Sequence, residues 1–255
     1  MPDWDAERYH RLSGPQLAWG RQVLSRLAPR PGERILDLGC GTGRVTADIA
    51  ATPGVRVVAL DLSEAMLSEA RTCVPGGVGL VRADGARLPF HGVFDAVFSG
   101  ATFHWIQDHD RLFEEVHGAL EPGGRIVAQC GGGPNLARLL ERAHTLMDSE
   151  PFASHFGVWS DPWTFAGIEE TRARLERAGF ESIDVWLEEA PTTLPDARAF
   201  TDFISCVCVR HHVDTLPSAL RPSFVAALAR QAATDHPPFT LDYWRLNISA
   251  RKARS

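Results

Sequence analysis

The 255-residue sequence has no apolar run long enough to cross a lipid bilayer. Its longest apolar runs, such as Val55–Leu60, fall far short of the roughly 20 residues that a membrane-spanning helix needs. The first twelve residues, MPDWDAERYHRL, carry charges where a secretory signal peptide needs an apolar core. We therefore expect a cytoplasmic protein that makes no membrane contact.

The sequence also has few cysteines and fewer basic than acidic residues. The five cysteines are scattered and odd in number, which does not make a disulfide framework. The formal net charge is -6, which disfavours a nucleic-acid partner because nucleic-acid-binding surfaces usually carry clustered basic residues. No internal repeat or low-complexity segment is present. With 44% hydrophobic and 23% charged residues, the chain suits one α/β domain with inserted segments.

A glycine-rich turn stands between a predicted strand and a predicted helix in the first third of the chain. The apolar run Ile35–Leu38 predicts a buried strand, and Val45–Ala51 predicts a helix. Three glycines lie in the turn between them: Gly39, Gly41 and Gly43. Glycine tolerates positive φ and lets a ligand approach the main chain closely. This order opens a nucleotide-binding βαβ unit, although Arg44 breaks the G-x-G-x-x-G spacing of dinucleotide-binding proteins.

Polar residues recur at the ends of the predicted strands. Asp37 precedes the glycine turn, Asp61 ends the second predicted strand, and Asp84 follows the third. Ser99 and His104 end or follow the fourth. Open α/β sheets bind ligands at the carboxyl ends of their strands, so we expect these residues to converge on one site. A carboxylate placed like Asp61 can accept hydrogen bonds from two ribose hydroxyls, with a helix-capping role beside Ser63 as the alternative.

The segment DLGCGTG, residues 37–43, resembles the first motif of class I S-adenosylmethionine (SAM)-dependent methyltransferases, which reads E/D-x-G-x-G-x-G. The segment RADGARLPF, residues 82–90, resembles the third motif of the same family. The resemblance covers residues 30–130. It implies a doubly wound, Rossmann-like α/β fold with a seven-stranded sheet, an antiparallel last hairpin and helical cap insertions.

The resemblance also implies SAM as the cofactor. Asp61 would hold the two ribose hydroxyls, and Asp84 would accept a hydrogen bond from the adenine amino group. Leu62 and Met66 would flank the adenine, with ordinary core packing as the alternative for both. The full predicted cofactor-binding set is Asp37, Gly39, Gly41, Gly43, Asp61, Leu62, Met66, Asp84, Gly85, Ala86 and Ser99.

The segment FDAVFSGATFHW, residues 94–105, resembles the trans-aconitate methyltransferases and related carboxylate O-methyltransferases. It departs from them at Ser99 or Gly100, where asparagine is usual. The resemblance implies O-methylation of a small-molecule carboxylate. A carboxylate is ionised at pH 7 and needs no general base, whereas a phenol, an amine or a carbon acid does. His104 is the predicted catalytic residue if a base is needed, and a packing or capping role is the alternative.

Other functions stay open at this point. The first alternative is O- or C-methylation of an aromatic or polyketide-like metabolite. An NAD(P)-dependent oxidoreductase is disfavoured by Arg44 and by the motif around Asp84. A catalytically silent SAM-binding protein is the last alternative. A small molecule is the expected partner, and the chain is expected to be a monomer or a homodimer.

The chain divides into a helical arm, a core and a longer remainder. The arm spans residues 1–30, and Tyr9 and Arg11 are expected to close over the ligand. The alternative is that Trp4, Tyr9 and Trp19 pack the arm onto the domain. The SAM-binding core spans 31–133, and 134–255 completes the same domain with substrate-covering insertions at about 134–167 and 196–235. Trp159, Trp163 and Phe165 are candidates for the roof of the pocket.

Four further features lie after residue 120. A turn is expected at Glu121–Gly124, and one closing strand over Phe239–Lys252. The pair Cys206-x-Cys208 before His211 and His212 is one residue tighter than the usual C-x₂₋₄-C of zinc sites, so no metal is predicted. Arg210 beside these histidines is a candidate cationic recognition point, with a solvated helix end as the alternative.

Overall fold

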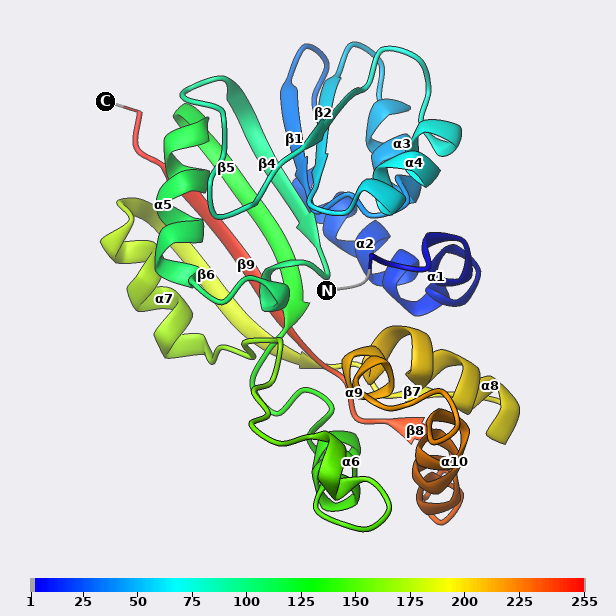
Figure 1. The fold of residues 1–255 in the computed structure, drawn as a ribbon. Coiled ribbons are helices and arrows are strands. Elements are labelled where there is room, and N and C mark those ends of the chain that lie inside the picture. The colour runs from blue at the N-terminus through cyan, green and yellow to red at the C-terminus, as the bar shows by residue number, and fades with distance from the viewer. Residues whose placement is uncertain (1–2, 255) are drawn as a thin grey trace.

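A seven-stranded sheet organises the computed structural model, which describes residues 3–254 (Figure 1). Its strands are β1 (Arg34–Leu38), β2 (Arg56–Asp61), β3 (Gly79–Arg82), β4 (Phe94–Gly100), β5 (Leu120–Gly131), β6 (Phe180–Glu189) and β9 (Trp244–Lys252). The spatial order is β3-β2-β1-β4-β5-β9-β6. The first five strands run parallel, and β9 is antiparallel to both β5 and β6. The predicted fold, with its antiparallel last hairpin, is confirmed.

Helices cover both faces of the sheet, which explains why the strands read as continuous apolar runs. On one face lie α2 (Gly14–Leu27) and α3 (Arg44–Ala50), whose Leu27 and Ile49 join a buried cluster with Ile35 of β1. On the other face lie α5 (His109–Ala119) and α7 (Ile168–Arg177), whose Phe113 and Leu175 share a larger cluster with the strands. The helix α4 (Glu64–Cys73) begins at the predicted N-cap Ser63, whose hydroxyl accepts a hydrogen bond from the Met66 amide at 3.1 Å.

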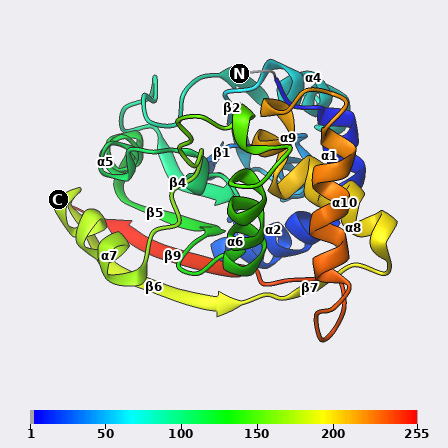
Figure 2. The ribbon, with the colours of Figure 1, turned by 60° about the horizontal axis from the view of Figure 1, so that its bottom comes forward.

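The two predicted insertions pack against each other into one helical layer at the carboxyl edge of the sheet (Figure 2). We call residues 134–167 and 192–243 the cap. Its elements are α6 (Ala137–Met147), β7 (Thr192–Thr193), α8 (Ala197–Phe203), a π-helical segment (Ile204–Cys208), α9 (Arg210–Thr215), α10 (Arg221–Ala232) and β8 (Thr240–Leu241). Leu139 of α6, Phe203 of α8 and Phe224 of α10 share one buried cluster. The cap therefore has a hydrophobic core of its own.

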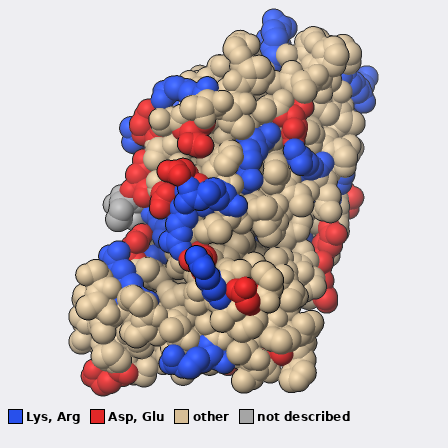
Figure 3. Space-filling view, turned by 90° about the vertical axis from the view of Figure 1, so that its right-hand side faces the viewer, with Lys and Arg blue, Asp and Glu red and all other residues tan. Residues whose placement is uncertain are grey.

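The N-terminal helix α1 (Ala6–Leu12) docks on the cap. The Arg8 guanidinium donates to the Ser205 hydroxyl at 2.9 Å and pairs with Asp202 of α8 at 3.4 Å. Acidic and basic side chains lie interspersed over this side of the molecule (Figure 3). This contact joins the N-terminal arm to a segment that lies nearly 200 residues later in the chain.

Two expectations about the chain after residue 120 are wrong. The predicted turn at Glu121–Gly124 is part of β5, where the pairing with β4 shifts register between Phe94 and Ala96. The predicted closing strand is divided into β8, which pairs with β7 in the cap, and β9, which pairs in the main sheet. Between them the Asp242 carbonyl accepts a hydrogen bond from the Leu136 amide at 3.0 Å, so the backbone there serves α6 instead of a strand.

Within residues 3–254, no helix combines the length and the apolar character that crossing a bilayer requires.

Candidate active site

A cavity of about 1070 Å³ lies at the carboxyl ends of β1, β2 and β4, between the sheet, the cap and the arm. Its walls come from residues far apart in the chain, from Trp4 in the arm to Arg245 in β9. This volume is at the upper end of what small-molecule sites offer, so it accommodates a nucleoside-sized ligand together with a second small molecule. The position agrees with the rule that open α/β sheets bind ligands beyond the carboxyl ends of their strands.

The glycine turn forms one wall of the cavity, and two of its glycines have different reasons to be glycine. Gly39 has φ of +78°, and a Cβ there would lie 2.1 Å from the Thr102 hydroxyl oxygen. That hydroxyl donates to the Gly39 carbonyl at 3.1 Å, so the turn packs directly on the chain after β4. Gly41 also has positive φ, but a Cβ there would meet no atom within 4 Å. Gly41 lines the cavity, and its bare backbone leaves room for a ligand.

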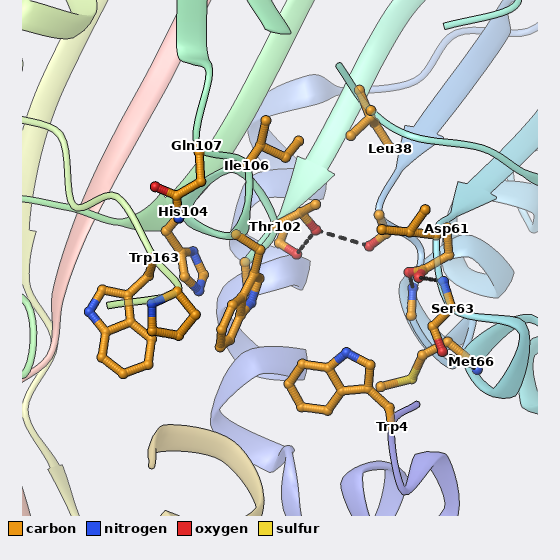
Figure 4. A pocket seen from close by; sticks show the side chains of 18 of the residues that line it. Trp4, Leu38, Asp61, Ser63, Met66, Thr102, His104, Ile106, Gln107 and Trp163 are labelled. Carbon is orange, nitrogen blue, oxygen red and sulfur yellow. Dashed lines mark hydrogen bonds between the residues drawn. The ribbon is translucent and has the colours of Figure 1, made fainter. Parts of the chain in front are cut away.

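The Asp61 carboxylate joins the glycine turn to the start of α4. One oxygen accepts from the Gly41 amide and the other from the Ser63 amide, both at 2.9 Å (Figure 4). Burial raises the pKa of Asp61 above its ordinary value, although the backbone amides that donate to it oppose the rise. A carboxylate offers about four lone-pair positions, so both oxygens keep capacity for further hydrogen bonds toward the cavity.

An apolar slot with a carboxylate at its edge lies beside Asp61. Leu62 lines it while 64% exposed, which is unusual for a large apolar side chain, and Met66 lies behind it, facing the cavity (Figure 4). Gly85 presses against Ile106, since a Cβ at Gly85 would lie 2.9 Å from the Ile106 Cδ1 atom. Asp84 is exposed, and one of its oxygens accepts from the Ala86 amide at 2.9 Å.

Most of the predicted cofactor-binding residues therefore line one side of the cavity. They are Gly39, Gly41, Asp61, Leu62, Met66, Asp84, Gly85 and Ala86. Their contacts with SAM stay predictions.

Three members of the predicted set do not line the cavity. Asp37 is 1% exposed, and its carboxyl accepts a hydrogen bond from the Thr46 hydroxyl at 2.6 Å. Burial, with the negative charge of Asp61 adding to it, raises the pKa of Asp37 to about 7. The Ser99 hydroxyl donates to the Leu38 carbonyl at 2.7 Å, and Gly43 caps α3 with φ of +79°. These residues support the turn and the strand ends from behind.

His104 lies in a 3₁₀ turn, Phe103–Trp105, and lines the cavity opposite Asp61 (Figure 4). Its Nδ1 atom accepts a hydrogen bond from the Gly131 amide at 3.2 Å. An amide N–H can only donate, so the proton of the neutral ring is assigned to Nε2. Burial, and then the charge of Arg245, hold the pKa of His104 well below its usual range. The geometry favours a hydrogen-bond donor at His104 over the predicted general base.

Arg245 lines the cavity but carries no sequence signal that marks it as a site residue. It lies in β9 opposite Gly131 of β5, on the same side as His104, and is 3% exposed. Its guanidinium lies over the Trp19 ring at 4.5 Å, and its Nε atom donates to Gln129 at 3.4 Å. Its Nη2 atom has no hydrogen-bond partner, and no carboxylate forms an ion pair with it among the described residues. The strand WRLNIS reads as apolar, and a single arginine within it is no motif.

The arm and the cap supply the remaining walls. Trp163 and Phe165 line the cavity, whereas Trp159 does not. Tyr9 lines it too, but Arg11 points away, because it is exposed and forms an ion pair with Glu7 one helical turn earlier. Trp4 of the arm and Arg210 of the cap also line the cavity, with the Arg210 guanidinium carbon 4.3 Å from the centre of the Trp4 ring. Arm and cap therefore meet over the cavity.

Comparisons with known proteins agree with this arrangement. A family profile described as "Methyltransferase domain" matches residues 36–128. The chain is 31% identical to a trans-aconitate 2-methyltransferase of Methylobacterium radiotolerans, covering 99% of this chain and 100% of that protein. It is 29% identical to the protein of the same name from Methylobacterium nodulans, covering all of both chains. A putative methyltransferase from Bacillus halodurans has the same fold, with a TM-score of 0.64 at 20% identity over 94% of this chain and 100% of that one.

The two glycines separate folding from ligand binding. In Gly39→Ala the new methyl would overlap the Thr102 side chain in a left-handed conformation, so we expect a loss of about 2 kcal/mol or more in the free energy of unfolding. In Gly41→Ala the new methyl meets no protein atom, so only the left-handed backbone conformation lowers the free energy of unfolding, by about 1 kcal/mol. The methyl would, however, take up space that the ligand needs. We expect Gly41→Ala to fold and to bind SAM at least tenfold more weakly. Urea unfolding and calorimetric titration measure the two effects, and equal stability losses would contradict this division.

The buried carboxyl of Asp37 makes stability depend on pH. Its folded-state pKa of about 7 lies above the unfolded value of 3.8, so the folded state binds the proton more tightly and its stability falls as pH rises from about 4 to 7. Asp37→Asn keeps an acceptor for Thr46 but cannot ionise. Relative to the wild type, we expect this variant to gain about 2–3 kcal/mol in unfolding free energy between pH 5 and pH 8. Urea unfolding of both proteins at several pH values measures it, and parallel pH curves would show that Asp37 does not titrate in this range.

Proposed function

This chain belongs to the class I SAM-dependent methyltransferases, and from that premise we propose that it methylates a carboxylate oxygen of a small anionic metabolite. Family membership decides against the oxidoreductase and the silent-binder alternatives. SAM supplies a methyl group that is already activated by the positive charge on its sulfur. What remains for the protein is to align donor and acceptor and to keep water out.

The donor would lie on the side of the glycine turn. Gly41 leaves room for it, Asp61 has lone pairs for the ribose hydroxyls, and the slot between Leu62 and Ile106 suits the adenine. Asp84 lies at the edge of that slot as an acceptor for the exocyclic amine. All of these residues are on the sheet side of the cavity, so the acceptor would occupy the side of the cap and β9.

The observation that carries the proposal is the buried guanidinium of Arg245 on that acceptor side. A charge that is 3% exposed and has no counter-ion among the described residues is costly, by several kcal/mol. Arg245 lines the cavity and its Nη2 atom has no hydrogen-bond partner among the described residues, so an anionic ligand in the cavity would compensate its charge. The planar fork of arginine matches the two oxygens of a carboxylate.

The acceptor side holds two histidines, His104 and His211, and burial lowers the pKa of both, which makes them poor bases and fits an acceptor that is already ionised. His104 has its Nδ1 occupied by the Gly131 amide and presents Nε2–H. A phenol or an amine would need a group that takes up its proton, and a neutral histidine with a strongly lowered pKa does this poorly. A carboxylate needs only donors that hold one oxygen while the other attacks. The relatives named trans-aconitate 2-methyltransferase support the same class of acceptor.

The aromatic or polyketide-like alternative has one observation in its favour. The cavity walls include Trp4, Trp105, Trp163 and Phe165, which suit a flat apolar acceptor. An aromatic carboxylic acid would use both this wall and Arg245. Substrate panels should therefore compare aliphatic polycarboxylates, such as trans-aconitate, with aromatic acids and with phenols that carry no carboxyl group.

The cofactor site is tested by calorimetric titration of the wild type and of Asp61→Ala with SAM and with S-adenosylhomocysteine. We expect micromolar binding of both by the wild type and at least a tenfold loss in Asp61→Ala, since a carboxylate hydrogen-bonded to two hydroxyls is removed. Asp48→Ala is the matched control and should bind as the wild type does, because Asp48 is a partly exposed aspartate of α3 that pairs with Arg21 and does not line the cavity. Absence of heat with either ligand in the folded wild type would contradict the assignment of the site.

The acceptor site is tested by Arg245→Met, which keeps the apolar stem of the side chain and removes its charge. We expect kcat/KM for carboxylate acceptors to fall at least 100-fold, because the anion loses its buried partner, while the Kd for SAM stays within a factor of three. Arg251→Met, on the exposed end of the same strand, is the control. Methyl ester formation is followed by mass spectrometry. Unchanged carboxylate turnover in Arg245→Met would overturn the proposal, and activity on neutral phenols alone would favour the alternative.

A further inference from the structure

Three side chains with metal-ligand chemistry meet in the cap, outside the cavity. They are His144 of α6, Asp161 in the loop that leads to Trp163, and His212 of α9. One ligand atom from each lies within 4.8 Å of the others. None of the three lines the cavity, so the mechanism described above does not use them. The helices α6 and α9 both pack near α10 (Figure 2), and the cluster bridges them.

The distance between the ligand atoms of His144 and Asp161 fits two ligands of a tetrahedral metal ion. The His144 Nε2 atom lies 3.2 Å from an Asp161 carboxylate oxygen. Two ligands bound at about 2.0–2.1 Å to a tetrahedral zinc ion are themselves about 3.3 Å apart. The side chains of His144 and Asp161 are 43% and 37% exposed, which leaves an entry path from solvent. Two histidines and one carboxylate are a set that Zn²⁺ accepts, with water in the fourth position.

His212 is the observation that points to a ligand. It is 0% exposed, and neither ring nitrogen has a hydrogen-bond partner among the described residues. Its ring is surrounded by aromatic rings, with Trp159 at 4.6 Å and Phe224 stacked at 6.1 Å between centroids. An unsatisfied buried polar group costs about 1–3 kcal/mol, and a phenylalanine would pack here without that cost. A buried histidine at this position therefore indicates that one of its ring nitrogens binds a ligand.

The surroundings of Asp161 are those of a metal-binding carboxylate. The Trp159 Nε1–H donates to the same Asp161 oxygen at 2.8 Å, which fixes the direction of the carboxylate. Ligating carboxylates in metal sites are commonly held by such a second hydrogen bond.

We propose that His144, Asp161 and His212 bind a Zn²⁺ ion that fixes the wall of the cap. The three ligands come from three segments whose neighbouring residues Leu140, Trp163 and His211 all line the cavity. An ion held here joins α6, α9 and the intervening loop, and so sets the positions of those wall residues. The ion is structural in this proposal and takes no part in methyl transfer.

The proposal is tested on full-length protein that has been stripped with a chelator and then titrated with ZnCl₂ by calorimetry. The wild type should bind one Zn²⁺ per chain at micromolar concentration or below, and its thermal midpoint should rise by several degrees with the metal. MgCl₂ should produce neither effect, because Mg²⁺ prefers an octahedral set of oxygen ligands. Cobalt(II) binding, read from its visible absorption, reports a tetrahedral site directly.

Two variants and one control assign the ion to this cluster. His212→Phe keeps the aromatic packing and should weaken Zn²⁺ binding at least 100-fold. Asp161→Asn keeps an acceptor for Trp159 and should weaken it at least tenfold. His155→Gln, an exposed histidine elsewhere in the cap, should bind Zn²⁺ as the wild type does. A wild type without a one-to-one site, or a His212→Phe that binds Zn²⁺ unchanged, would overturn the proposal.

Discussion

The site depends on one carboxylate, Asp61, which lies at the end of β2 and joins the turn after β1 to the start of α4. It accepts the Gly41 amide from the turn after β1 and the Ser63 amide at the start of α4. These bonds shape the glycine turn and aim bare backbone at the cavity. The same carboxylate is largely buried near Asp37, so negative charge is concentrated under the turn at a cost in free energy. A ligand with positive charge would lower that cost.

Two largely buried charges of opposite sign line the cavity. Asp61 lies at the end of β2, where exposed arginines such as Arg82 also line the wall, whereas Arg245 lies on the side of β9 and the cap. On the proposed function, Asp61 would face the cationic methyl donor and Arg245 the anionic acceptor. The two charges would then favour this orientation of the reactants over the reverse one.

The sheet and its glycine turn could be predicted from the sequence, because they are written in local patterns. Apolar runs such as Ile35–Leu38, bounded by glycine or acidic residues, mark buried parallel strands, and the motif spacing marks the ligand. Arg245 could not be predicted as a site residue, since its role depends on the pairing of β9 with β5 at Gly131. His104 was identified, but which of its nitrogens is free depends on the Gly131 amide. The division of 239–252 into two strands likewise depends on contacts with α6.

On the proposed function, the same buried arginine that binds the substrate also favours release of the product. Methylation turns one carboxylate into a neutral ester, so the group that faced Arg245 or its neighbours loses a full negative charge. The guanidinium is buried and forms no ion pair with a carboxylate among the described residues. The neutral ester therefore compensates its positive charge less well than the carboxylate substrate does. An internal counter-ion would have made the empty site more stable but would have competed with the substrate. The uncompensated charge of Arg245 is therefore a cost in stability that favours binding of the acid over its ester.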